Sequence, residues 1–190
     1  MKKGLEKFYD LVEAFESLPT IGKKSALRLA YHIIMNDNFS GIKIAHCIEN
    51  AIGSIKRCRH CGCMSEHEIC EICLDDTRDK HRLCIVQSAK DIFIIEESKQ
   101  FNGLYFVLNE LDEFLIQKLI EFVKNNQTQE ILFAITPSIS NDAFIIFIED
   151  KLQNFNIAFS KIAQGVPTGV SLENVDMLSL AKAIQSRVGV

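Results

Sequence analysis

Three stretches in the first third of the chain repeat their apolar residues at the helical period. They cover residues 4–17, a stretch from about 24 to 34, and a stretch from about 42 to 55. Apolar positions three and four residues apart lie on one face of a helix, so each stretch predicts an amphipathic helix. Residues 17–22, between the first two stretches, contain Pro and Gly and predict a turn.

Beyond residue 82 the pattern changes to short β-rich runs that alternate with helical stretches. Strands are predicted over residues 83–86, 104–108, 130–135 and 157–162. Helices are predicted over residues 89–97, 111–124, 142–153 and 175–187. Such alternation is typical of βαβ units, in which helices cover a mostly parallel sheet. The predicted fold class is therefore α+β, with a helical N-terminal part and a C-terminal α/β part that meet near residues 78–82.

The segment between these two parts has neither period but carries two pairs of cysteines. Two residues separate Cys58 from Cys61 and Cys70 from Cys73, and eight residues lie between the pairs. Each pair forms a tight turn that directs two thiolates at one ion, and two such turns supply the four soft ligands of a tetrahedral zinc site. Because so short a segment cannot bury a core, we expect a structural zinc ion to hold it together. Four thiolate ligands leave no open position for a substrate, so zinc catalysis is not expected.

The spacing leaves alternatives open for the other cysteines and histidines. Cys63, His60 and His67 lie in or beside the pairs, and each could replace one of the four ligands. Cys47 and Cys84 fall on a predicted helix and a predicted strand, where free thiols are usually buried. A redox Cys-x2-Cys motif needs only one pair, which argues against that reading. Seven cysteines, an odd number, without an export signal argue against disulfides.

The turn between the first two helices resembles a helix–hairpin–helix, an element that binds DNA without sequence preference. Gly22 permits a tight hairpin, and the helix that follows begins there, so its free N–H groups and positive dipole end can receive a phosphate. Lys23, Lys24 and Arg28 add positive charge. None of these groups reads base edges, so sequence specificity is not expected. A plain helical hairpin with a Gly turn gives the same pattern and stays an alternative.

Charge is distributed unevenly and favours the DNA reading of the first third. The whole chain has a net charge of −4, but residues 1–60 hold 10 Lys and Arg against 6 Asp and Glu. A phosphate-binding surface is therefore expected there, with Lys2, Lys3 and Lys7 as further candidates. No apolar run approaches the ~18 residues of a membrane span. Acidic residues interrupt the N-terminus where a signal peptide is uncharged, so a cytoplasmic protein is expected.

Taken together and in order, these motifs resemble the RecR family of bacterial recombination mediators. The hairpin reads Leu-Pro-Thr-Ile-Gly-Lys-Lys-Ser-Ala at residues 18–26, and the four-cysteine cluster and the α/β part follow it. Further residues agree with the family pattern at Arg28, Ala30, His32, 71–73, Asp79, 165–169, Leu172, Asp176, Leu180 and Ala183. The resemblance covers residues 5–188.

The resemblance implies a fold and a function. It implies a Toprim-like domain at 79–165 after a helical DNA-binding part at 1–56 and a zinc finger at 57–78, with a C-terminal segment at 166–190. It implies a homodimer or tetrameric ring that clamps DNA and acts with RecO and RecF to load recombinase at single-stranded gaps. No catalysis is expected of such a mediator.

Departures from a catalytic Toprim site support the absence of catalysis. A catalytic Toprim site holds magnesium with carboxylates, one at the end of the first strand and another after the third strand. The chain has Gln87 and Ser140 there, with Asp142 as the only acid in the second loop. A Toprim-type magnesium-dependent nuclease or primase-like enzyme that uses Asp142 is the alternative. The short connection at Asn109 and Glu110 departs from the family as well.

Overall fold

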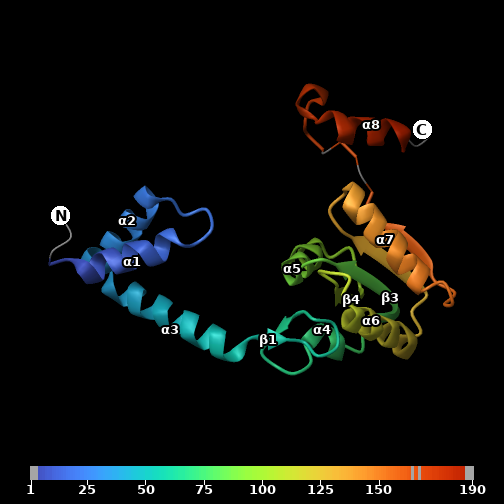
Figure 1. Cartoon of the computed structure of the whole chain (residues 1–190), viewed down its shortest axis with the longest axis horizontal. Helices are drawn as coiled ribbons and strands as arrows, with labels where there is room; N and C mark the ends of the chain where they lie inside the picture. The colour runs from blue at the N-terminus through green and yellow to red at the C-terminus, as the bar shows by residue number, and fades with distance from the viewer. Residues whose placement is uncertain (1–3, 164, 167, 187–190) are drawn as a thin grey trace. The chain divides into compact units, whose positions relative to one another are not determined.

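A computed structural model describes residues 4–163, 165, 166 and 168–186 (Figure 1). The chain divides into two compact units, Met1–Ile55 and Lys56–Val190. The helical N-terminal part, the four-cysteine segment and the C-terminal α/β part confirm the predicted fold class. The predicted helix over 175–187 ends at Gln185, and residue 187 lies outside the described residues. None of the described helices is both long and apolar enough to cross a membrane.

The first unit is a helical hairpin followed by a longer helix. Its elements are α1 (Glu6–Glu16), α2 (Lys23–Tyr31), a π-helical turn (His32–Asn36) and α3 (Asn38–Ser54). Ala26 and Ala30 of α2 are fully buried against Val12 of α1, because side chains this small let the two helices approach closely. The helix predicted from about 42 begins at Asn38, since Asp37 caps it by accepting a hydrogen bond from the Ser40 N–H at 3.0 Å.

Helix α3 keeps its apolar face but does not bury it. No residue of α3 is buried, and Phe39, Ile48 and Ile52 are 78%, 53% and 79% exposed. The helical period of this stretch was predicted correctly, whereas the described residues of its unit do not bury the face. Large exposed apolar surfaces of this kind are typical of protein–protein contacts.

The second unit is a four-stranded parallel sheet with helices on both faces. Its strands are β3 (Asp79–Val86), β4 (Gly103–Val107), β5 (Glu130–Ala134) and β6 (Ala158–Lys161), in the order β4-β3-β5-β6. Its helices are α5 (Ala89–Ser98), α6 (Glu113–Asn126), α7 (Ile139–Lys151) and α8 (Met177–Gln185), with a short 3-10 turn at Leu172–Asn174. All four strands and all four helices fall where the sequence predicts them. Helix α7 begins three residues before the predicted start because Ser138 caps it through the Asn141 N–H.

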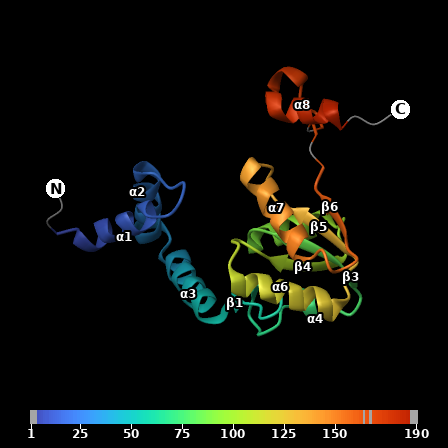
Figure 2. The same cartoon turned by 45° about the vertical axis from the view of Figure 1, so that its right-hand side comes forward.

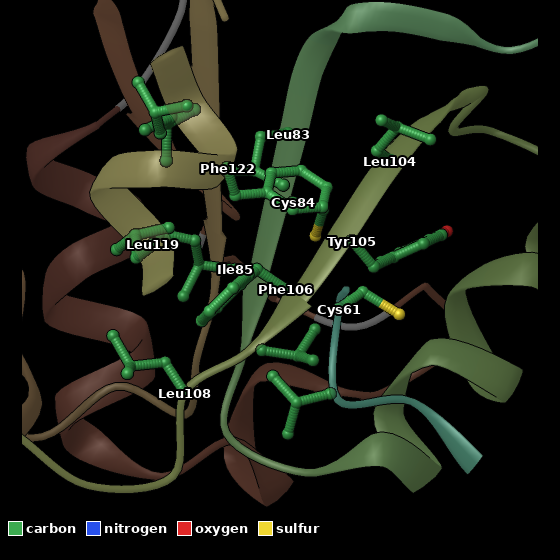
Figure 3. Close-up of a cluster of buried hydrophobic side chains, with 14 of the residues drawn as sticks. Cys61, Leu83, Cys84, Ile85, Leu104, Tyr105, Phe106, Leu108, Leu119 and Phe122 are labelled. Atoms are coloured by element: carbon green, nitrogen blue, oxygen red, sulfur yellow. The ribbon is translucent and has the colours of Figure 1, made fainter. Parts of the chain in front are cut away.

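Alternation along β4 determines which helix covers which face of the sheet. The Tyr105 hydroxyl bonds to Glu96 of α5, whereas the next residue, Phe106, meets Phe122 of α6 edge to face at 5.7 Å. Successive residues of a strand point to opposite faces, so α5 and α6 lie on opposite sides. Figure 3 shows Leu119 and Phe122 of α6 directed at this core.

The four-cysteine segment packs against the outer edge of this sheet. It consists of β1 (Lys56–Arg57), β2 (Met64–Ser65) and the single turn α4 (Glu71–Leu74). The Val107 N–H of edge strand β4 donates to the Cys61 carbonyl at 2.8 Å. Gly62, at φ 77°, lies so close to Val107 that a Cβ would come within 3.2 Å of the valine Cβ. The segment thus covers backbone groups that an open sheet edge would expose.

An ion pair fixes the end of the cysteine segment to α5 and β4. Arg78 donates to Glu96 at 3.0 Å and to the Gly103 carbonyl at 2.9 Å, and Tyr105 donates to the same carboxylate at 2.6 Å. The Arg78 side chain is only 11% exposed and also lies near Asp75. Burial alone would raise the pKa of Glu96, but the hydrogen bonds from Arg78 and Tyr105 outweigh it and hold that pKa below its usual value.

We predict that Arg78→Ala lowers the free energy of unfolding by about 3 kcal/mol, because it leaves the Glu96 carboxylate largely buried without its cation. Arg82→Ala is the matched control: Arg82 pairs with Glu130 at 2.8 Å, but both side chains are about 40% exposed, and we expect a loss below about 1 kcal/mol. Urea denaturation measures the free energy of unfolding of both variants. Equal losses for the two variants would contradict this account.

The stability of the wild type should also depend on pH through Glu96. The stability that its lowered pKa contributes is present above about pH 4.5, the ordinary glutamate pKa, and is lost as the pH falls through the folded-state value.

Candidate metal centre and nucleic-acid interface

Four cysteine sulfur atoms converge at one point of the second unit. The Sγ atoms of Cys58, Cys61, Cys70 and Cys73 all lie within 4.8 Å of one another. The Cys58–Cys73 and Cys61–Cys70 sulfur pairs are 4.0 and 3.5 Å apart. A tetrahedral zinc ion with Zn–S bonds of about 2.3 Å separates its sulfur ligands by roughly 3.8 Å. The donor set therefore fits a tetrahedral metal ion.

Backbone N–H groups donate hydrogen bonds to two of the sulfur atoms. The Cys63 N–H donates to the Cys61 sulfur at 3.4 Å, and the Cys70 N–H donates to the Cys58 sulfur at 3.3 Å. Such hydrogen bonds stabilise negative charge on a thiolate and fix its direction. Three of the four cysteines are buried, and they belong to the same apolar core as the sheet.

The thiols cannot all ionise by themselves. Hydrogen bonding with the neighbouring thiols, first Cys61 and then Cys70 and Cys73, holds the pKa of Cys58 below its usual value. The hydrogen bond with Cys58 raises the pKa of Cys61. Four thiolates this close together repel one another, so full deprotonation needs a cation at the centre.

The structure places the other candidate ligands outside the group of four. Cys63 is buried beside the cluster, but it contributes its N–H rather than its sulfur, and His60 and His67 are exposed. Cys84 is fully buried, and burial raises the pKa of its thiol to about 12, which confirms it as a core thiol. Cys47 is exposed, so its prediction as a core thiol is wrong; no residue of α3 is buried.

The second candidate site is the start of α2, which is open to solvent. Ala26 is the first residue of the helix whose N–H bonds inside it, to the Gly22 carbonyl at 3.0 Å, and no side chain of the described residues caps the helix. The preceding N–H groups point out of the helix end, where an anion is favoured. Lys23, Lys24 and Arg28 are all exposed on this helix.

Gly22 plays a different part from the one expected of it. Its φ of −85° is open to any residue, and the left-handed residue of the turn is Thr20, at φ 69°. A Cβ added at Gly22 would meet nothing within 4 Å. The absence of a side chain therefore leaves the helix end accessible and does not serve the turn itself. Lys2 and Lys3 lie outside the described residues, as does Pro167 of the C-terminal motif.

Comparison with known proteins decides the family. A model of the RecR helix-hairpin-helix matches residues 8–52, and a model of the RecR four-cysteine zinc finger domain matches residues 55–75. "Recombination protein RecR" of a Nitratiruptor species is 57% identical over 188 residues, which cover 99% of each chain. The chain belongs to the RecR family. Proteins of the same name from Campylobacter jejuni (strain 81-176) and Helicobacter pylori (strain Shi470) are 57% and 45% identical over 187 residues, 98% of this chain and 98% and 97% of theirs.

The RecR matches fall on the two sites described above. The helix-hairpin-helix match contains the open start of α2 with its cations, and the zinc-finger match contains all four converging cysteines. The rest of the chain, with the parallel sheet, is covered by the whole-length RecR relatives.

The carboxyl end of the RecR sheet, where the sequence suggested a dismantled magnesium site, holds an amide pair. The Gln87 side-chain nitrogen donates to the Asn141 oxygen at 2.9 Å, and Asn141 donates to the Thr136 carbonyl at 2.6 Å. Asp142 lies 3.2 Å from the Lys161 ammonium. Within the described part of the chain, the four cysteines form the one group of three or more side chains suited to a metal.

Some residues of these sites were not found from the sequence. Asn141 and Lys161 act through partners 54 and 19 residues away, and the Arg78–Glu96 clamp spans 18 residues. No local motif signals such pairs, because each depends on the register of the parallel strands.

We predict that Cys73→Ser abolishes stoichiometric zinc binding and unfolds the cysteine segment, since three thiolates no longer complete the tetrahedron. Cys47→Ser and Cys63→Ser are the controls, and both should retain the zinc of the wild type. Metal analysis of the purified proteins measures this directly. Loss of zinc from Cys63→Ser with retention in Cys73→Ser would mean that the ligand set is wrong.

Proposed function

We propose that this chain is a DNA-binding recombination mediator without catalytic activity of its own. Membership of the RecR family over the whole length carries the proposal, because the relatives are named recombination proteins. In this role the protein acts in recombinational DNA repair, in the cytoplasm. It works with RecO and RecF to load recombinase at single-stranded gaps.

DNA contact is assigned to the start of α2. Gly22 leaves the helix end uncovered, its neighbouring N–H groups receive a phosphate, and Lys23, Lys24 and Arg28 neutralise adjacent phosphates. All of these groups address the backbone of the nucleic acid, so binding is independent of sequence. The chain's net charge of −4 makes the binding of a single subunit weak and favours an assembly that adds several such helices together.

Zinc is assigned a structural role at Cys58, Cys61, Cys70 and Cys73. The sulfur spacing supports this, and all four positions are protein ligands, so no site remains for a substrate. The ion would hold the zinc finger at 57–78 against the edge of the Toprim-like domain at 79–165. The helical part at 1–56 and the C-terminal segment at 166–190 complete the proposed division.

A homodimer or tetrameric ring is supported by the uncovered apolar surface of α3. Its exposed residues, Phe39, Ile42, Ile48 and Ile52, lie on a helix of which no residue is buried among the part of the chain that the structure describes. Closed symmetric assemblies commonly bury such faces.

We predict that Lys23→Glu/Lys24→Glu weakens DNA binding and lowers the slope of log affinity against log salt by about 0.9 for each phosphate that the variant no longer neutralises. Lys124→Glu/Lys151→Glu, on α6 and α7, carries the same charge change outside the proposed site and should bind nearly as the wild type does. Filter binding across a salt series measures both pairs, and light scattering should give one assembly size throughout. Equal weakening by the two pairs would remove α2 from the mechanism.

The competing function is a Toprim-type magnesium-dependent phosphoryl-transfer enzyme. The Gln87–Asn141 amide pair and the Lys161 partner of Asp142 weigh against it, because amides and a neutralised carboxylate are poor magnesium ligands.

We expect zinc-loaded protein with magnesium to shift gapped plasmid on a gel and leave it intact, because the described residues hold no cluster of acids that could bind a metal and activate a phosphate. The Asp142→Ala variant is the matched control and should behave identically. Cleavage or relaxation by the wild type that disappears in Asp142→Ala would establish the enzyme instead.

A further inference from the structure

A cleft of about 570 Å³ lies between the cysteine segment and α6. Arg59 and His60 line it from the cysteine segment, and Phe114, Lys118 and Asn125 line it from α6. Both walls belong to the second unit, and Figure 2 shows α6 beside the turns of this segment. The cleft adjoins the sulfur cluster at one point, because Cys73 is also on its lining.

An aromatic ring with a cation on it stands at one wall of the cleft. Phe114 lies in the first turn of α6 and is 66% exposed, although its ring contributes to no core. The Lys118 ammonium, one helical turn later, lies 4.9 Å from the centre of this ring. The pair presents a flat apolar surface directly beside a positive charge.

Arg59 lines the opposite wall and follows two further cations, in a unit that is otherwise acidic. Residues 56–190 hold 14 Lys and Arg against 19 Asp and Glu, yet Lys56, Arg57 and Arg59 fall within four positions. Lys56 and Arg57 are exposed and form no salt bridge within the described part of the chain, but they precede the cleft and do not line it. Arg59 bonds to Glu68 at 2.9 Å, but side-chain exposures of 73% and 71% make this pair weak and exchangeable.

We propose that this cleft binds single-stranded DNA, with an unpaired base against Phe114 and phosphates at Lys118 and Arg59. Stacking on an aromatic ring beside cations is how proteins hold single strands without reading their sequence. A duplex offers no free base face, so the cleft should discriminate against it. The one acid on the lining, Glu121, is outnumbered by the cations. An acidic peptide would satisfy the cations but would leave the open ring unused, and so it fits less well.

This inference rests on the proposed DNA-binding function and adds a second contact of different chemistry to it. The helix α2 addresses phosphates alone, which duplex and single strand share. The cleft addresses a base face, which the single strand alone offers.

The chain contains its own matched control for this proposal. Phe147 and Lys151 of α7 repeat the arrangement of Phe114 and Lys118, with the lysine 5.2 Å from the ring centre and an exposed phenylalanine, but they line no part of the cleft. Phe114→Ala and Lys118→Gln can therefore be compared with Phe147→Ala and Lys151→Gln.

The experiment measures fluorescence anisotropy of labelled oligothymidine and of a hairpin duplex with the full-length, zinc-loaded proteins. We expect Phe114→Ala to weaken oligothymidine binding on the order of tenfold and to leave duplex binding unchanged. Lys118→Gln should lower the salt slope for oligothymidine by about 0.7, the value of one phosphate contact to a single strand. The two α7 variants should match the wild type, and zinc content reports that each variant is folded.

Crosslinking tests the same contact without any substitution. Oligothymidine with 5-iodouracil should crosslink, under ultraviolet light, to the tryptic peptide that contains Phe114. Crosslinks confined to the first unit would overturn the proposal.

The remaining outcomes separate the two proposals. If the wild type binds both DNAs but Phe114→Ala behaves as Phe147→Ala does, the cleft is not a DNA site and the proposed function stands. If Phe114→Ala and Lys118→Gln lose only a labelled polyglutamate peptide, the cleft docks protein and this inference is wrong. If the wild type binds neither DNA, the proposed function itself fails.

Discussion

The convergence of four cysteine sulfur atoms is the constraint on which the second half of this molecule depends. The segment at 56–74 has two two-residue strands and one helical turn, too little for a core of its own. Once its sulfur atoms are gathered, its backbone pairs with Val107 and covers the outer edge of β4. Arg78 then ties the end of the segment to α5 through Glu96. Metal site, sheet edge and clamp therefore form one continuous packed structure.

The exposed cations of the proposed DNA site and the large core of the sheet lie in different units of the chain. The cations of α2 stand on a hairpin with a small core of its own, and their side chains are exposed to water. The sheet, in contrast, ends in uncharged amides at Gln87 and Asn141, where a parallel α/β sheet commonly binds a ligand or metal. A protein built in this way can hold a polyanion without acting on it. That division of labour is what the proposed mediator role requires.

Local patterns predicted most of the fold, and long-range contacts account for what they missed. Helical period and β-rich runs predicted the four strands of the parallel sheet and helices α5 to α8, whereas β1, β2 and α4 of the cysteine segment have no such pattern. Paired spacing predicted the four cysteines whose sulfur atoms converge, although it left Cys63, His60 and His67 open as alternatives. Helix α3 shows what periodicity does not predict. The apolar period indicated a helix, but it could not indicate that Ile48 and Ile52 on its apolar face stay exposed. Three further features could not be predicted from the sequence: the Gln87–Asn141 amide pair, the Arg78–Glu96 ion pair and the cleft beside α6. Each joins elements that only the tertiary fold brings together.

Hydrogen exchange of the β4 amides, with and without bound metal, tests the central claim most directly. With zinc bound, the Val107 N–H should be strongly protected by its bond to the Cys61 carbonyl. A chelator should remove that protection and loosen β4, while the amides of α1 and α2, in the other unit, exchange as before. Undiminished protection of Val107 after complete removal of the metal would contradict the account, because the sheet edge would then be held without the cysteine cluster.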